Sequence, residues 1–309
     1  MNMIAVPIPP IFWRIGQFAL TGALIVLLWT AADGAAIART LGSAHPGWVA
    51  AAVITLVFQT ILSAWRWKVT AGALGQTLPL SKAVHEYFLS QAVNQSLPGG
   101  CVGDAARAVR ARADVGLAVS GLAVGLERLA GQIIMFTGLA CAFVITYFTA
   151  GGLDWPPSYA GPIGLTIGLI ALGFIGLAAL RGPIRALKPS VAHWIDMGLR
   201  ALASRDVLPA QVTLGIMIAT CNLAAFGFCA WAVGQHLQLG VLLAVVPLIL
   251  FTMLIPLTVS GWGARETGAA ALLPIAGVPV AESVAASILF GLALLVAVTP
   301  GFLAMIAKR

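Results

Sequence analysis

The chain has 309 residues, of which 60% are hydrophobic and only 9% are charged, and its mean hydropathy is +1.00. A soluble domain carries roughly a quarter charged residues, so this composition excludes a soluble globular protein and predicts an all-α, polytopic membrane protein. The formal net charge is +7, but no basic cluster lies on a polar face with interleaved aromatic residues, so no nucleic-acid partner is expected. We expect one integral membrane domain over residues 1–309, with halves of roughly 1–150 and 151–309.

Apolar runs of about 20 residues, the length that crosses a bilayer as a helix, predict about six full crossings. Ala-rich sequence follows the first run, as it can follow a signal peptide, but the long apolar core of this run and the many runs behind it favour a retained helix. The runs lie near residues 12–32, 46–64, 118–148, 159–180, 210–234 and 283–306.

Basic residues are distributed unequally between the ends of these crossings. With the N-terminus in the cytoplasm, only Arg39 falls outside, and Arg128 and Arg265 fall at membrane depth. The other lysines and arginines all fall on the cytoplasmic side: Arg14, Arg66, Lys68, Lys82, Arg107, Arg110, Arg112, Arg181, Arg185, Lys188, Arg200, Arg205, Lys308 and Arg309. The positive-inside rule therefore predicts a multi-pass protein of the cytoplasmic (inner) membrane with both termini in the cytoplasm.

The first break in the apolar pattern follows the second crossing. Bare backbone beside charged groups is costly at membrane depth unless it lines a polar cavity. We therefore expect residues 83–104 to form a re-entrant hairpin that enters from the cytoplasm and returns. The residues that break the pattern are Pro98, Gly99, Gly100 and Gly103.

Three residues around this break are candidate substrate ligands, namely Asn94, Asp104 and Arg107. Asp104 suits a helix N-cap, and a helix start with Arg107 one turn further on suits a lipid phosphate. The alternative is a capped juxtamembrane helix that rests on anionic headgroups. Asn94 shares a helical face with Gln91 and Gln95, and this polar stripe either lines a headgroup path or joins helices by hydrogen bonds.

Glu127 and Arg128, two further candidate ligands, lie inside the run at 118–148, which we expect to be a bent helix or two pieces. Adjacent side chains on a helix diverge by about 100°, so each needs a partner elsewhere. These charges form either a structural ion-pair lattice or part of a substrate site. The candidate partners are Arg107 or Arg265 for Glu127, and Asp104 or Glu266 for Arg128.

A second break precedes the last crossing, at Pro256, Gly261 and Gly263. The next charged residues are also candidate ligands: Arg265 suits a bidentate phosphate contact, and Glu266 suits Arg265 or an amine headgroup. Residues 242–266 are expected to form a hairpin that enters from the opposite side, so that the two hairpins form an inverted repeat. We expect the two charged clusters to meet near the middle of the membrane.

The order of these motifs resembles the lysylphosphatidylglycerol synthase transmembrane-region family, which contains a flippase-like domain. The resemblance rests on residues 94–107, on Glu127-Arg128 and on residues 261–266 before a final hydrophobic helix, and it covers nearly the whole chain. It implies a lipid-translocating domain with two re-entrant halves. The chain departs from the family pattern where Val102-Gly103, rather than two glycines, precedes the acid.

Full-length synthases that this chain resembles add a soluble aminoacyl-transferase domain. The sequence ends at Arg309 without one, so aminoacylation of a lipid is not expected. Small members of the group also occur with hopanoid biosynthesis, and the chain resembles these in length. A hopanoid is therefore one candidate ligand.

The sequence contains no Ser/His/Asp set, HExxH motif, P-loop or acidic metal pair, and its cysteines and histidines lack metal-ligand spacing. We therefore expect no enzymatic activity, no catalytic residues, no cofactor and no metal. The expected function is translocation of a polar-headgroup or isoprenoid-derived membrane lipid through a cavity between the halves. The alternative is an accessory subunit that binds an enzyme of lipid, hopanoid or envelope-glycolipid biosynthesis and moves nothing.

Overall fold

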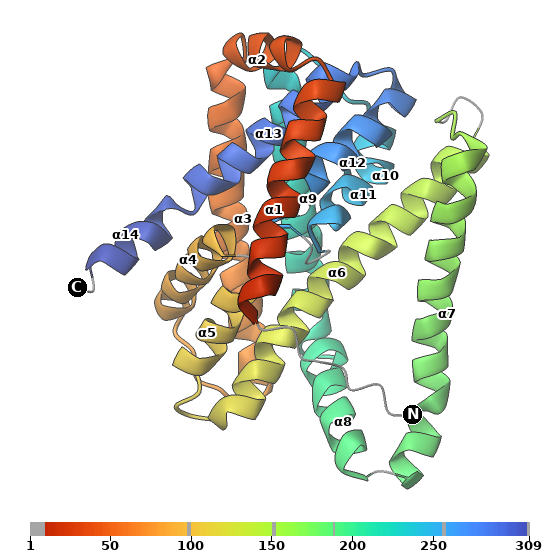
Figure 1. Ribbon diagram of the computed structural model, residues 1–309. Helices are drawn as coiled ribbons and strands as arrows, with labels where there is room; N and C mark the ends of the chain where they lie inside the picture. The colour runs from red at the N-terminus through yellow and green to blue at the C-terminus, as the bar shows by residue number, and fades with distance from the viewer. Residues whose placement is uncertain (1–9, 98–99, 150–152, 188, 255–257, 308–309) are drawn as a thin grey trace, which may run out of the picture.

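The computed structural model of the chain describes residues 10–97, 100–149, 153–187, 189–254 and 258–307, and every regular element in these ranges is helical (Figure 1). The predicted all-α fold is confirmed. The helices, with η for a 3₁₀ helix, are α1 Pro10–Ala31, α2 Gly34–Gly42, α3 Pro46–Ala73, α4 Leu80–Ser96, α5 Val102–Arg110, α6 Gly116–Phe148, α7 Pro157–Leu187, α8 Pro189–Ala203, α9 Leu208–Ala232, α10 Leu239–Ala244, α11 Val246–Phe251, η1 Thr252–Leu254, α12 Ala264–Leu272, η2 Leu273–Ala276, α13 Val280–Ala297 and α14 Thr299–Ala307.

Four helical segments of the described residues are long and apolar enough to cross a membrane: 46–73, 116–148, 208–232 and 280–306. They confirm four of the predicted crossings. The crossing predicted at 12–32 lies in α1, which meets α2 at a bend of 92° and qualifies as a fifth span only together with it. The crossing predicted at 159–180 lies in α7, of which residues 157–173 form a shorter apolar helix. The chain is therefore a multi-pass membrane protein.

The helix α6 is one continuous element of 33 residues, not two pieces. At 1.5 Å per residue it is about 50 Å long, well over the roughly 30 Å that an upright crossing of a hydrocarbon core needs. Figure 1 shows this helix running diagonally across the molecule. The charges at Glu127 and Arg128 do not interrupt the helix, because both side chains find partners on neighbouring helices.

The centre of the fold is the packing of α3 against α9. Small residues allow close approach there: Ala52 on α3 and Ala225 on α9 are fully buried in one cluster. Association of helices within a bilayer depends on such small residues, since lipid tails supply no hydrophobic driving force. The helices α4, α6 and α13 pack around this pair and complete the core.

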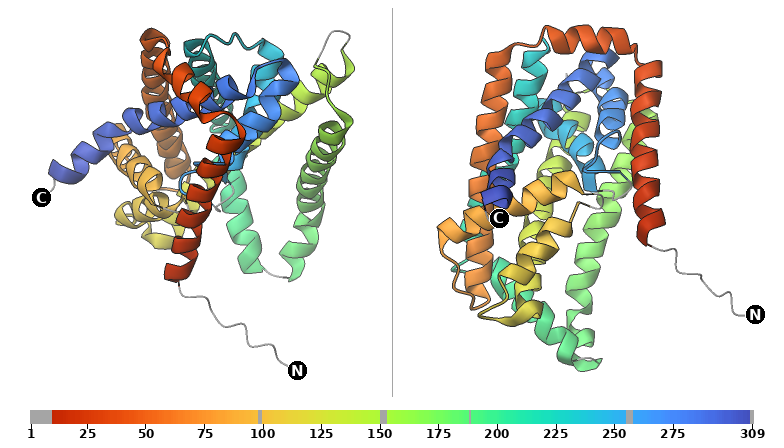
Figure 2. Two further views of the ribbon diagram at one scale, coloured as in Figure 1. Left: turned by 45° about the horizontal axis from the view of Figure 1, so that its top comes forward. Right: turned by 60° about the vertical axis from the view of Figure 1, so that its left-hand side comes forward.

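Each predicted break separates two short helices that pack against each other. The first hairpin consists of α4 and α5, and the second of α10, α11 and η1 followed by α12. The right-hand view of Figure 2 shows the first hairpin in the lower half of the molecule and the second in the upper half. A hydrogen bond from Ser260 Oγ to Gln95 Oε1 joins the two breaks.

The conformation of the second break depends on glycine and on α1. Gly263 precedes α12 with φ +83°, a left-handed conformation that favours glycine, and a Cβ there would meet Leu24 of α1 at 2.7 Å. The amide N–H of Val259 donates to Thr21 Oγ1 of α1 at 3.0 Å. The helix α1 therefore supports the second break from the side.

Candidate functional site

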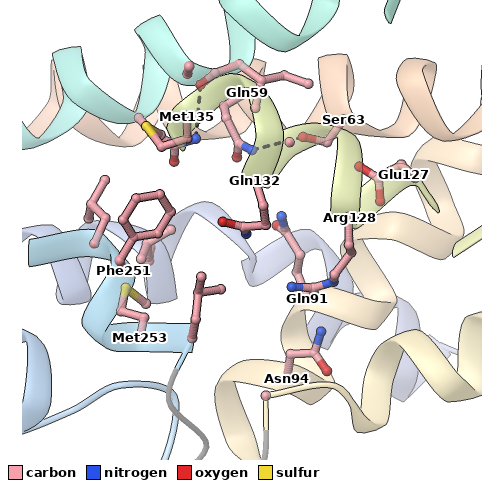
Figure 3. Close-up of a pocket in the computed structure, with 18 of the residues that line it drawn as sticks. Gln59, Ser63, Gln91, Asn94, Glu127, Arg128, Gln132, Met135, Phe251 and Met253 are labelled. Atoms are coloured by element: carbon pink, nitrogen blue, oxygen red, sulfur yellow. Dashed lines mark hydrogen bonds between the residues drawn. The ribbon is translucent and has the colours of Figure 1, made fainter. Parts of the chain in front are cut away.

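A polar pocket of about 290 Å³ lies between the two breaks. Its lining comes from α3, α4, α6 and α9 and from both hairpins, including Gly100 of the first break and Ser260 of the second. In Figure 3 the side chains of Gln91, Arg128 and Gln132 point toward one another, and Phe251 and Met253 face them from the other side. The pocket is therefore amide-rich on one wall and apolar on the other. Its amide-bearing side chains are Gln59, Gln91, Asn94, Gln95, Gln132 and Asn222.

A buried ion-pair cluster forms the wall of this pocket on the side of α6. The Glu127 carboxylate has no exposed surface and accepts from Arg66 Nη2 at 2.7 Å and from Arg107 Nη2 at 3.3 Å. The Tyr87 hydroxyl donates to the same carboxylate at 3.3 Å. Of the two partners considered for Glu127, the structure has Arg107, and it adds Arg66 from α3.

The guanidinium group of Arg107 is held in an aromatic cradle. It lies between the rings of Trp67 and Tyr87, 4.4 Å and 4.3 Å from their centroids. Cation–π contacts of this kind strengthen when the cation is desolvated, and the Arg107 side chain is 0% exposed. Arg107 thus joins α5 to α3, α4 and α6, and it does not line the pocket.

Asp104 is not the N-cap of α5. The cap position is Cys101, and Asp104 lies in the first helical turn, where it accepts from Ser90 Oγ at 3.0 Å and Asn94 Nδ2 at 3.1 Å. Asn94 supplies the capping acceptor instead, because its Oδ1 accepts from the free N–H of Gly103 at 2.7 Å. The Gly103 N–H at the start of α5 is therefore already bonded to a protein group, and the phosphate contact expected at this helix start stays a prediction.

Arg128 is the exception among these charges. Its guanidinium pairs with Asp104, one of the two partners considered for it, but 43% of its side chain is exposed and lines the pocket. Asp104 keeps donors from Ser90, Asn94 and Arg107 in addition. Arg128 is therefore the group of this cluster that can contact a ligand without leaving its carboxylate partner unsatisfied.

Arg265 and Glu266 form a separate pair. Arg265 Nε donates to Glu266 Oε1 at 3.1 Å and to Ser287 Oγ at 3.0 Å, while Glu266 Oε2 caps α12 by accepting from Gly263 N at 2.7 Å. Arg265 is 1% exposed, and neither charged residue lines the polar pocket. The two charged clusters do not meet in the structure. The residues of the second hairpin that line the polar pocket are uncharged, and they include Met253 and Ser260.

The predicted break residues fall into two groups. Gly100 and Gly261 have φ of +60° and +78°, and like Gly263 they lie outside regular helices. Gly103 lies inside α5, where a Cβ would overlap the Ser90 carbonyl of α4, so its role is close approach of the two helices. The remaining break residues, Pro98, Gly99 and Pro256, lie outside the described residues.

Several pocket residues were missed by sequence reasoning, although a signal for them exists. Gln59, Ser63 and Arg66 follow one another at i, i+4 and i+7, which places them on one face of α3. Gln132 lies four residues after Arg128, on the same face of α6. These are polar stripes in apolar helices, and both contribute to the pocket lining.

Among the described residues, no group of three or more His, Cys, Asp or Glu side chains is arranged to hold a metal ion. The chemistry available in the pocket is that of amides, hydroxyls and one half-exposed guanidinium. Such groups bind phosphate, carboxylate or hydroxyl oxygens.

Comparison with known proteins agrees with the motif order. The profile of one family, described as the lysylphosphatidylglycerol synthase TM region, matches residues 14–301. No curated protein and no solved structure gives a significant match. Because the matched region covers nearly the whole chain, this protein belongs to the family of lysylphosphatidylglycerol synthase transmembrane regions.

Proposed function

We propose that this protein translocates a membrane lipid by passing its polar headgroup through the pocket between the two hairpins. The substrate is a lipid with a polar headgroup or an isoprenoid-derived lipid, with hopanoids among the candidates. The protein acts in the cytoplasmic membrane without a cofactor and without catalysing a reaction. The family membership and the apolar helices support this proposal.

The observation that carries the proposal is the position of Arg128. A charged side chain at membrane depth is costly unless it pairs or faces a polar cavity, and Arg128 does both. Around it, the amides of Gln91 and Gln132 offer donors and acceptors to the same space. A purely structural ion pair needs no such exposed, amide-lined space.

The charge balance of the cluster favours an anionic or strongly hydrogen-bonding headgroup. Three guanidinium groups, from Arg66, Arg107 and Arg128, face two carboxylates, from Asp104 and Glu127. The cluster therefore carries one excess positive charge, and Arg128 is the arginine of the cluster whose side chain is substantially exposed. A phosphate or carboxylate oxygen would complete the balance through a charge-assisted hydrogen bond.

The arrangement of the hairpins supports a path through the membrane. We infer that the α4–α5 hairpin is re-entrant from the cytoplasmic side and the α10–α12 hairpin from the opposite side, as two halves of an inverted repeat with both termini cytoplasmic. Broken helices that meet at the midplane are the usual construction of transporter sites. Rocking of one half against the other would expose the pocket to each leaflet in turn.

The test is dithionite quenching of headgroup-labelled lipids in proteoliposomes. Phosphatidylglycerol, phosphatidylcholine, a polyprenyl phosphate and a headgroup-bearing hopanoid are compared for wild type and Arg128→Gln. Loss of one charge-assisted hydrogen bond lowers the rate roughly tenfold or more. Arg112→Gln removes an exposed arginine after α5 and is the matched control, with a rate expected to equal wild type.

Two results would contradict the proposal. If folded wild-type protein moves none of these lipids, the accessory-subunit alternative is favoured, and a lipid-biosynthesis enzyme becomes the expected partner. If wild type moves a lipid but Arg128→Gln moves it equally fast, the headgroup does not use this pocket.

A further inference from the structure

A second cavity, of about 450 Å³, lies between α6, α7 and the second hairpin. Its walls are almost entirely apolar, with Ile133 and Phe136 from α6, Ile163 and Ile167 from α7, and Phe251 from α11. The Thr166 hydroxyl in the wall donates to the Pro162 carbonyl of its own helix at 2.8 Å, so it offers little to a ligand. The chemistry of this cavity suits a hydrocarbon chain.

The apolar cavity adjoins the polar pocket. Gln132, Phe251 and Leu254 line both spaces, and therefore form the boundary between them. The Gln132 side chain is half-buried at this boundary and makes no hydrogen bond to another described residue. Its amide is therefore free to bond a polar group of a ligand on the pocket side.

Residues of both α6 and α7 line this cavity. Figure 1 shows α7 diverging from α6 and standing away from much of the molecule. Among the described helices, the main neighbour of α7 is α8. The apolar cavity therefore lies toward the outer side of the helix bundle.

We propose that the apolar cavity binds the hydrocarbon chain of the lipid whose headgroup occupies the polar pocket. This inference rests on the proposed function and refines it: the ligand is an amphiphile with a long apolar chain, and it enters sideways between α6 and α7. Gln132 and Phe251 hold the junction of head and chain. A free polar solute, such as a soluble phosphate ester, fills only one of the two adjoining spaces and is not a substrate.

The first test is to fill the apolar cavity. Ile167→Trp places a bulky ring in the wall, whereas Leu172→Trp adds the same ring to α7 at an exposed position that does not line the cavity. With the lipid that wild type moves fastest, Ile167→Trp is expected to lower transport at least fivefold and Leu172→Trp to leave it unchanged. Equal rates for the two variants would overturn the inference, since the cavity would then hold only bulk lipid.

The second test separates this inference from the proposed function. Phosphatidylglycerol with a diazirine in its acyl chain is photolysed with purified protein in vesicles, and adducts are mapped by mass spectrometry. A chain site is supported by adducts on Phe136, Ile163 and Phe251. These adducts are expected to disappear when unlabelled phosphatidylglycerol competes and to decrease in Ile167→Trp, even if no lipid is transported. Adducts confined to the outer face of α7, or competition by free glycerol 3-phosphate, would contradict it. Transport that depends on Arg128 but not on Ile167 leaves the proposed function intact and removes only the chain site.

Discussion

The buried carboxylate of Glu127 offers the sharpest test of the ion-pair cluster. Glu127→Gln preserves the size of the side chain and removes its charge, so that the guanidinium groups of Arg66 and Arg107 lose their shared carboxylate and keep at most one neutral amide oxygen as acceptor. Both guanidinium groups are almost fully buried, and Arg66 has no other carboxylate partner among the described residues. Breaking a buried pair by removing one partner costs about 3–5 kcal/mol.

A loss of that size is a large share of the stability of a typical domain, roughly 5–15 kcal/mol. The free energy of unfolding is measured by tryptophan fluorescence in mixed micelles of increasing sodium dodecyl sulfate content. Asp154→Asn removes an exposed carboxylate in the connection after α6 and controls for the loss of a negative charge. Its expected change is within about 0.5 kcal/mol.

A double variant distinguishes pairing from packing. Arg66→Gln with Glu127→Gln removes one charge of each sign, and the net charge of the cluster returns to that of wild type. We expect the double variant to lose at least about 1 kcal/mol less than the sum of the losses of the two single variants, within the range of coupling energies for residues in contact. A Glu127→Gln protein as stable as wild type, or a double variant whose loss equals that sum, would refute the reasoning.

Two further substitutions test the hairpins. Gly103→Ala forces a Cβ against the Ser90 carbonyl of α4, so we expect a loss of about 1–3 kcal/mol in the same unfolding assay, and an unchanged stability would show that α4 and α5 do not approach so closely. Arg265→Ala leaves Glu266 buried without its cation, so we expect a stability loss of about 3–5 kcal/mol, seen as lower thermal stability in detergent. A fully stable Arg265→Ala protein that has lost lipid transport would instead support the direct phosphate contact expected from the sequence.

The features that the sequence predicts well are those that the bilayer dictates. Long apolar runs must be helices, because backbone groups have no other partners in lipid, and four of the predicted crossings are found at their expected places. The breaks at Gly100 and Gly261 are also found between helices, where both residues have a positive φ, a conformation that favours glycine. The Glu127–Arg107 and Arg128–Asp104 contacts were among the pairs considered, since a deep charge must find an opposite one.

The features that the sequence does not predict depend on tertiary contact. Arg66 lies near the end of its apolar run, so the positive-inside rule assigns it to the cytoplasm, whereas in the structure it reaches Glu127 across 61 positions of the chain. The sequence predicts a phosphate contact for Arg265, and for Glu266 either a contact with Arg265 or one with an amine headgroup. In the structure Arg265 donates to Glu266, as the first of these alternatives has it, and also to Ser287, which the sequence does not indicate. Asp104 was expected at an N-cap, and only the packing of α4 reveals that Asn94 takes that role.

The central claim is that a lipid headgroup passes through the polar pocket, and reversible chemical blocking tests it most directly. Gln132→Cys is made in a protein whose four native cysteines are replaced, and the purified protein is modified with a charged methanethiosulfonate before reconstitution. Leu172→Cys, exposed on α7, is the control. The account predicts that modification stops transport by Gln132→Cys alone and that dithiothreitol restores it in the same sample. Complete modification at position 132, verified by mass, with transport unchanged would contradict the account.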